Sequence, residues 1–207
     1  MRTLPHQTFY SWQVTKEDSE SKIESQKREL RNRFRFERRQ RSLGGDWLHL
    51  LDASELINAS TVASYLSYGE EPDTAKINQS IIASGKRLLL PKTDDQGVIT
   101  WIESNEKMTV ERSRKNRKFA EPIGDQFHGQ IDVVICPALR VDRSGVRLGQ
   151  GGGSYDRALN EVNTQRAWKV ALLHDEEVSS EPLPQESHDV RMDAVALPEI
   201  LVRFKNR

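Results

Sequence analysis

Hydrophobic side chains spaced three and four residues apart predict a long helix that begins at Ser21 and ends at the glycine pair 44–45. The residues that recur at this spacing are the hydrophobic Ile23, Leu30 and Phe34, together with the basic Lys27 and Arg31. The other positions of the helix are mostly charged, and arginine dominates among them. A second helix is predicted over "DWLHLLDASELINA", residues 46–59, with Asp46 as its N-cap.

Further along the chain, short apolar runs alternate with segments of helical period. The runs that predict strands are "TVASYL", "KRLLLPK", "VITWIES", "IDVVICPAL", "WKVALLH" and "MDAVAL", the last of which is expected to close the sheet. Helices are predicted over "DTAKINQSIIASG" and "SYDRALNEVN". Since such alternation is typical of α/β folds, we expect a three-layer open sheet, mostly parallel, with helices on both faces.

The beginning of the chain shows no period, so residues 1–20 are interpreted as a flexible N-terminal arm and residues 21–207 as a single α/β domain. No stretch reaches the roughly 20 apolar residues that a membrane helix needs, and no signal-peptide core precedes the domain. The single cysteine, Cys136, lies in an apolar run and is expected to be a buried hydrophobic residue. A cytoplasmic monomer without a membrane partner is the resulting expectation.

Charge is balanced, with 31 basic and 31 acidic side chains, so the net charge does not indicate a nucleic-acid partner. The basic residues nevertheless gather in the first helix and in "ERSRKNRKF", residues 111–119. The run 111–119 is interpreted as an exposed loop, with closure over an anionic ligand as the alternative. A nucleic-acid module built from the helix and this loop is the weakest of the functional hypotheses, because no aromatic-basic RNA-binding motif is present.

Glycine is concentrated in one segment, because five of the chain's 12 glycines lie between Gly145 and Gly153. This segment follows an apolar strand and precedes a predicted helix, so its backbone N–H groups are available to an anion. Glycine also permits a close approach of ligand atoms to the backbone. Arg147 adds a charged fork that suits phosphate oxygens, and Asp156 supplies a carboxylate that suits a hard divalent cation. The segment therefore predicts a site for a nucleotide polyphosphate.

Neither of the two common glycine motifs fits this segment. No Gly-x-x-x-x-Gly-Lys-Ser/Thr string occurs, and Ser154 stands where the dinucleotide pattern requires its last glycine. The stretch "VVICPALRVDRSGVRLGQGGGSYDRAL" instead resembles the signature of 5-formyltetrahydrofolate cyclo-ligases, also called methenyltetrahydrofolate synthetases. "QKRELR", "YLSYGEEPDT", "LLLPK", "AEP" and "SHDVRMDAV" match further landmarks of that family in the same order, so the resemblance spans about Ser21 to Leu197.

The resemblance implies a fold like that of the NagB/RpiA/CoA transferase group and an ATP- and Mg²⁺-dependent reaction. In this reaction 5-formyltetrahydrofolate becomes 5,10-methenyltetrahydrofolate, and ADP and phosphate are released. The positions that the resemblance assigns to ATP are Lys27, Arg28, Arg31, Arg147, Leu148, Gly149, Gly151, Gly152, Gly153 and Tyr155. Arg147 is the candidate catalytic residue, because it can neutralise charge on the transferred phosphoryl group.

Folate is assigned to Leu66, Glu71, Gln150 and Ser154, and the metal to Asp156 and Asp189. Lys92 is a further candidate for phosphate contact, whereas His188 beside Asp189 is not interpreted as a catalytic dyad. Gln150 and Ser154 differ from the family's usual residues at these positions. A non-catalytic homologue that binds nucleotide or folate on the same fold is therefore the alternative function.

Overall fold

The computed structural model describes residues 16–41, 44–104, 110–112 and 120–205. Most of the predicted arm and residues 113–119 of the basic run lie outside the described residues. The long helix α1 (Lys16–Arg39) begins before the predicted start at Ser21. Because the residues before Ser21 carry no apolar period, the hydrophobic pattern could not show that they are helical.

The central sheet has seven strands in the order β12-β11-β9-β6-β1-β2-β3. Neighbouring pairs among the five inner strands are parallel, and the two edge strands are antiparallel to their neighbours. In the order of the sheet the strands are β12 (Leu201–Arg203), β11 (Ala194–Ala196), β9 (Trp168–Leu172), β6 (Val133–Pro137), β1 (Thr61–Ala63), β2 (Arg87–Thr93) and β3 (Ile99–Ser104). The predicted mostly parallel α/β sheet is confirmed, but β12 rather than the run 192–197 closes it.

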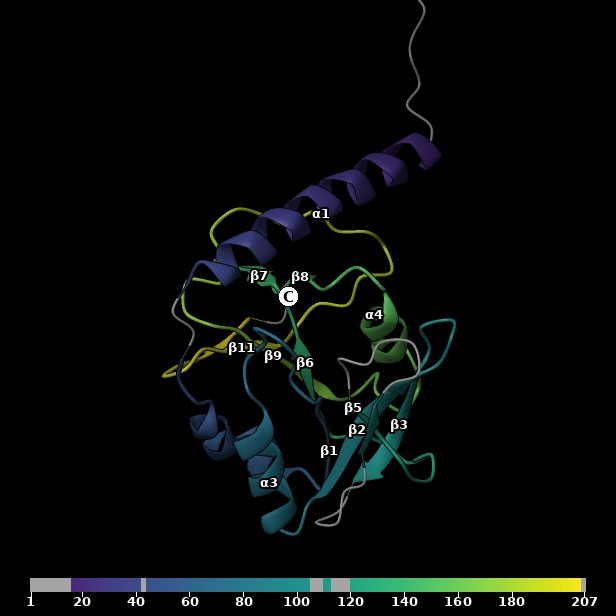
Figure 1. Ribbon diagram of the computed structural model, residues 1–207, viewed down its shortest axis with the longest axis vertical. Coiled ribbons are helices and arrows are strands. Elements are labelled where there is room, and N and C mark those ends of the chain that lie inside the picture. Colours follow the sequence, from purple (N-terminus) through teal and green to yellow (C-terminus); the bar gives the residue numbers. More distant parts are fainter. Residues whose placement is uncertain (1–15, 42–43, 105–109, 113–119, 206–207) are drawn as a thin grey trace, which may run out of the picture.

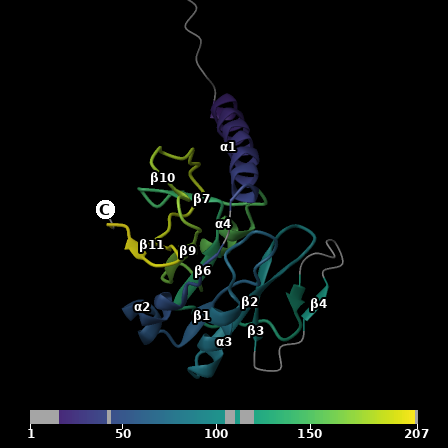
Figure 2. The same cartoon turned by 60° about the vertical axis from the view of Figure 1, so that its left-hand side comes forward.

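Alternate residues of the strands from β12 to β2 in the sheet order enter two separate hydrophobic clusters, as the pleat of a strand requires. Leu88 and Leu90 of β2 pack into one cluster with α3 (Ala75–Ala83), whereas Leu89 packs into the other with α4 (Ser154–Leu159). Helices therefore cover both faces of the sheet, as predicted, and Figures 1 and 2 show α3 and α4 at opposite sides of it. Cys136 is completely buried, and burial raises the pKa of its thiol to about 12, which fits a core residue.

The predicted second helix is wrong as a single element. Its residues form a 3₁₀ helix, η1 (Leu48–Asp52), and a short α-helix, α2 (Ser54–Asn58). Ala53 separates the two with an extended backbone at φ −66° and ψ 133°. The predicted N-cap at Asp46 is wrong, because η1 begins one residue later with Trp47 as its N-cap; Asp46 still accepts a hydrogen bond from the backbone N–H of Leu48, at 3.3 Å. Apolar residues on both segments face the core, so burial outweighs helical continuity here.

Two smaller sheets were not predicted, because their strands are too short to show an alternating pattern. One has the order β10-β7-β8 and contains β7 (Arg140–Asp142), β8 (Arg147–Leu148) and β10 (Val178–Ser179). The other pairs β4 (Val110–Arg112) with β5 (Ala120–Pro122). The β7–β8 hairpin delivers the glycine segment, since β8 ends at Leu148.

Helix α1 lies across the β10-β7-β8 sheet, at the end of the molecule that faces the carboxyl end of β6 (Figure 1). Phe34 packs there with Leu139, Val146, Leu148 and Leu183. The basic side chains of α1 are thus held directly above the glycine segment. Among the described residues no helix combines the length and the apolar composition that a membrane span requires.

Candidate active site

A cleft of about 660 Å³ lies between α1, the glycine segment and the loop after β10. It contains almost every residue that the sequence assigned to a ligand, although these residues come from widely separated parts of the chain. The members of the predicted set that line it are Lys27, Arg31, Leu66, Glu71, Arg147, Leu148, Gly149, Gln150, Gly151, Gly152, Gly153, Ser154, Tyr155, Asp156 and Asp189. The tertiary structure therefore brings the predicted set together at one site.

The glycines of this segment lie against arginine side chains of the chain itself. A Cβ atom at Gly149 would come within 2.6 Å of Nη1 of Arg147, and one at Gly151 within 3.3 Å of Nε of Arg31. Gly151 and Gly153 also have φ angles of +109° and +63°, which disfavour any residue with a side chain. The absence of side chains thus allows guanidinium groups and backbone amides to share the floor of the cleft.

Arg147 is a deeply buried cation of the cleft, with 6% of its surface exposed. Its Nη2 donates to Asp156 at 2.7 Å and its Nη1 donates to the carbonyl of Pro137 at 3.3 Å. Burial by itself lowers the pKa of Arg147, but Asp156 more than offsets this, so the pKa is raised and the charge is kept. Nε of Arg147 is buried and has no hydrogen-bond partner among the described residues, so this donor is left unsatisfied by the protein.

Tyr155 lies under the same guanidinium, whose central carbon is 5.7 Å from the centre of the ring. Burial raises the pKa of its phenol well above the usual value, so the ring stays neutral. A tyrosine in this position supports the arginine from below through a cation–π contact. It thereby helps to fix the direction in which the unpaired Nε points.

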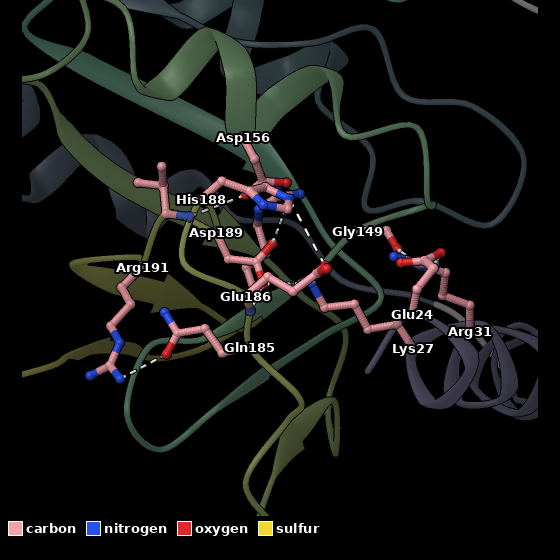
Figure 3. A network of polar contacts seen from close by, with 12 residues as sticks. Glu24, Lys27, Arg31, Gly149, Asp156, Gln185, Glu186, His188, Asp189 and Arg191 are labelled. Atoms are coloured by element: carbon pink, nitrogen blue, oxygen red, sulfur yellow. Dashed lines mark hydrogen bonds and ion pairs between the residues drawn. The ribbon is translucent and has the colours of Figure 1, made fainter. Parts of the chain in front are cut away.

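Lys27 is buried between two carboxylates of the loop after β10 (Figure 3). Its Nζ donates to Glu186 at 2.7 Å and to Asp189 at 2.5 Å. Burial lowers the pKa of Lys27, but the hydrogen bonds that Lys27 donates to Asp189 and Glu186 outweigh this effect and the pKa is raised. Lys27 therefore remains an ammonium that can exchange carboxylate oxygens for phosphate oxygens.

Two arginines of α1 contact the glycine segment from above. Nε of Arg31 donates to the carbonyl of Gly149 at 3.3 Å, and its Nη1 pairs with Glu24 at 2.8 Å (Figure 3). Arg35, which the sequence did not single out, donates to the side-chain oxygen of Gln150 at 3.0 Å and to its carbonyl at 2.6 Å. The four-residue spacing of these arginines is the signal that could have found Arg35.

Glu71 and Leu66 line the cleft from the segment that follows β1. Burial raises the pKa of the Glu71 carboxyl, although a hydrogen bond from the backbone N–H of Tyr68 opposes this effect. Asn78 and Thr74 hold the beginning of this segment through the carbonyl of Tyr65. A partly desolvated carboxylate beside an apolar residue suits a flat ring that carries adjacent N–H donors.

Two predicted contacts are not brought to the cleft. Arg28 is exposed and points away from it, because consecutive helical residues point about 100° apart. Lys92 does not line the cleft either, although its neighbours Pro91 and Thr93 do. In a strand, successive side chains alternate between faces, which separates Lys92 from them.

Three acidic residues that line the cleft were not assigned from the sequence, namely Glu24, Asp94 and Glu186. Glu186, His188 and Asp189 offer ligand atoms within 4.8 Å of one another, and Asp156 lines the same cleft. His188 is largely exposed, and its Nε2 lies 3.8 Å from Asp189, too far for a hydrogen bond. Glu186 stands three residues before Asp189, and the turn that brings the two together could not be predicted from the sequence.

Taken together, the fold and the cleft define an α/β protein whose glycine-lined, cationic site faces carboxylates able to hold a divalent cation. Residues 16–198 match the model of the 5-formyltetrahydrofolate cyclo-ligase family, so the chain belongs to this family. The chain is 34% identical over 149 residues to a 5-formyltetrahydrofolate cyclo-ligase of Mycolicibacterium smegmatis, covering 69% of this chain and 76% of the relative. A cyclo-ligase of Escherichia coli is 32% identical over 147 residues, with 69% and 80% covered.

The solved structures agree on the fold. The NMR structure of Aquifex aeolicus 5,10-methenyltetrahydrofolate synthetase superposes with a TM-score of 0.71 at 24% identity, covering 87% of this chain and 94% of that one. A 5,10-methenyltetrahydrofolate synthetase from Mycoplasma pneumoniae gives a TM-score of 0.62 at 19% identity, covering 82% and 97%. The expected fold class and family are thus confirmed, and nothing in these comparisons favours the non-catalytic alternative.

Proposed function

We propose that this protein converts 5-formyltetrahydrofolate into 5,10-methenyltetrahydrofolate, with ATP as co-substrate, Mg²⁺ as cofactor, and ADP and phosphate as products. The observation that carries the proposal is the cleft itself. Cations from α1 and β8 meet the backbone of the glycine-rich residues 149–153 at one part of it, and Glu71 with Leu66 lines another. Family membership supplies the reaction, and the cleft supplies groups for both substrates.

The triphosphate would bind along the glycine segment. Backbone N–H groups at glycines and Nε of Arg147, which has no partner in the described part of the chain, would donate to phosphate oxygens, and Lys27 and Arg31 would approach from above. The residues that fit the cation are Asp156, Asp189 and Glu186, because carboxylate oxygens suit Mg²⁺. When bound, Mg²⁺ neutralises negative charge on the phosphates.

In the proposed reaction the formyl oxygen attacks the γ-phosphorus and the bond to ADP breaks. N10 then bonds to the formyl carbon and gives up its proton to the solvent, which closes the ring, and the former formyl oxygen leaves with phosphate. Such a transfer depends on alignment and on neutralisation of charge more than on a strong nucleophile. Support for Arg147 as the source of that charge is that Asp156 holds one of its terminal nitrogens, while its Nε has no hydrogen-bond partner among the described residues. Glu71 would accept hydrogen bonds from the pterin ring and orient the formyl group.

The test is the appearance of methenyltetrahydrofolate absorbance in mixtures that contain protein, ATP, Mg²⁺ and 5-formyltetrahydrofolate. Omission of any one component should abolish the signal. Arg147→Ala, measured at the same concentration, should retain little activity. If the complete mixture gives no absorbance at high enzyme concentration while calorimetry detects folate or nucleotide binding, the non-catalytic alternative replaces this proposal.

A further inference from the structure

A buried ion pair anchors α1 to the turn between β9 and β10. Glu177, with 1% of its surface exposed, accepts hydrogen bonds from Nε and Nη2 of Arg38 at 2.7 and 2.6 Å. Arg140 lies 3.7 Å from the same carboxylate. Neither Arg38 nor Glu177 lines the cleft. Such a buried bidentate pair is therefore suited to fixing the position of one element against another.

The same turn contacts the segment that carries Glu71. The backbone N–H of His174 donates to Glu177 at 2.9 Å, and Nε2 of His174 lies 2.9 Å from the carbonyl oxygen of Glu70. Because a carbonyl oxygen can only accept, Nε2 carries the hydrogen in this contact. Nδ1 is buried without a hydrogen-bond partner among the described residues, and burial lowers the pKa of the ring. Both observations agree with a neutral imidazole that donates through Nε2.

The histidine ring is itself held in place. It is 6% exposed and packs edge-on against the indole of Trp47, with ring centres 5.5 Å apart. Trp47 is fixed in turn by a hydrogen bond from its Nε1 to the carbonyl of Leu173 at 3.0 Å. The donor that reaches the Glu70 carbonyl is thus mounted on a rigid, buried support, whereas the side chain of Glu70 is exposed.

We propose that His174 is a positioning residue for the folate substrate. His174 holds the Glu70 carbonyl and thereby fixes the adjacent Glu71 carboxylate. This inference rests on the proposed function, in which Glu71 binds the pterin. Glu71 lines the cleft and Glu70 does not, so the His174 contact fixes the backbone directly behind the binding group. Through Glu177 and Arg38 the same contact also keeps this segment in register with the helix that carries Lys27 and Arg31.

The substitution His174→Phe keeps an aromatic ring against Trp47 but removes the donor. We expect KM for 5-formyltetrahydrofolate to rise about 10-fold, as for one lost hydrogen bond, while KM for ATP changes less than about 2-fold. His174→Gln provides the matched variant, because the side-chain amide can donate at a similar distance from the backbone. It should restore most of the folate KM, which general damage to the fold would not predict.

The measurement is steady-state methenyltetrahydrofolate formation, with thermal unfolding of each variant and calorimetric titration of 5-formyltetrahydrofolate alongside. An unchanged folate KM in His174→Phe, or equal rises for folate and ATP, would overturn the inference. So would a His174→Gln variant no better than His174→Phe. If His174→Phe does not fold, the comparison of His174→Gln with the wild type decides, since a 10-fold loss there also contradicts the inference.

Failure of the proposed function looks different. In that case the wild-type chain gives no methenyltetrahydrofolate, and the calorimetric Kd for 5-formyltetrahydrofolate takes the place of KM in the same comparison. A wild-type chain that neither turns over nor binds the folate would overturn both proposals.

Discussion

A Cβ atom at position 149 would lie 2.6 Å from Nη1 of Arg147, so the guanidinium of Arg147 occupies the space that a side chain at Gly149 would need. The φ angle of Gly149 is not in the left-handed region, so the requirement for glycine here is one of space and not of backbone conformation. The same guanidinium contacts Asp156 and the carbonyl of Pro137. The lack of a side chain at Gly149 therefore leaves the room that the Arg147 guanidinium needs for these contacts.

Gly149→Ala should displace Arg147 and lower kcat/KM about 10- to 100-fold, since a misplacement of about 1 Å at a catalytic group has effects of this size. Gly152→Ala is the comparison, because a Cβ there meets only Ser154 Oγ at 3.5 Å. Its loss should be clearly smaller. The absorbance assay on both variants checks this, and equal losses would show that Arg147 is not what makes Gly149 necessary.

Arg147→Ala should lower kcat about 100- to 1,000-fold, as expected when a charge-stabilising donor is lost. Arg147→Lys keeps the charge but loses the fork, and should recover only part of the rate. Because Asp156 would be left unpaired in Arg147→Ala, the melting temperature should also fall. Assays performed below that temperature separate the two effects. A fully active Arg147→Ala protein would refute the proposed role of Arg147.

Lys27→Met removes the cation between Glu186 and Asp189, whose side chains are only 16% and 9% exposed. We expect a loss of about 1–3 kcal/mol in the free energy of unfolding, because two partly buried carboxylates lose their partner. A divalent cation can replace the ammonium, so Mg²⁺ should raise the melting temperature of this variant more than that of the wild type.

Lys22→Met, which changes an exposed lysine of the same helix, is the control for Lys27→Met and should behave like the wild type. Thermal unfolding with and without Mg²⁺ provides the measurement. An equal Mg²⁺ response of all three proteins would argue against a cation site formed by Glu186 and Asp189.

Glu71→Gln tests how far burial of the Glu71 carboxylate lowers the stability of the folded protein. Since burial raises the pKa of Glu71 in the folded state above its ordinary value of 4.5, the protonated carboxyl favours folding. This contribution is fully present below pH 4.5 and is lost as the pH rises through the raised pKa. The variant should therefore be more stable than the wild type at pH 7 but not at pH 4, while its folate KM rises.

The comparison for Glu71→Gln is Glu70→Gln, at the exposed neighbouring side chain. Glu70→Gln should leave both the unfolding curve and the folate KM close to those of the wild type. Chemical denaturation at the two pH values checks the stability, and a destabilised Glu71→Gln protein at pH 7 would contradict the prediction.

The edge strand β12 is tied to α2 by two hydrogen bonds of 2.8 Å from Arg203 to Glu55. The bond from Arg203 lowers the pKa of Glu55 to about 2 from 4.5. This stabilisation is present above pH 4.5 and is lost as the pH falls toward 2. Because the Arg203 side chain is 46% exposed, Glu55→Gln should cost only about 0.5–1 kcal/mol at pH 7. In an Arg203→Gln background the same change should have no further effect, which denaturant melts of the double-mutant cycle can check.

Much of the architecture follows from hydrophobic periodicity alone. The run 131–139 predicts a buried strand because every position except Asp132 is apolar, and β6 lies at the centre of the sheet with neighbours on both sides. The hydrophobic pattern did not predict the elements whose form depends on tertiary contacts. Residues 46–59 have a helical period but break at Ala53, and the two-residue strand β8 is too short to have a period at all.

The sequence by itself determined the α/β class and the family, and nearly all the residues that it assigned to ligands line the cleft, because these assignments depend on local period and on the order of motifs along the chain. Only the tertiary structure decided that Arg28 faces away, that Lys27 sits between Glu186 and Asp189, and that His174 contacts the backbone behind Glu71. All three findings depend on side-chain direction. The contacts of Lys27 and His174 also join residues that lie more than 100 positions apart in the sequence. Such contacts are set by packing of the whole domain and leave no local pattern in the sequence.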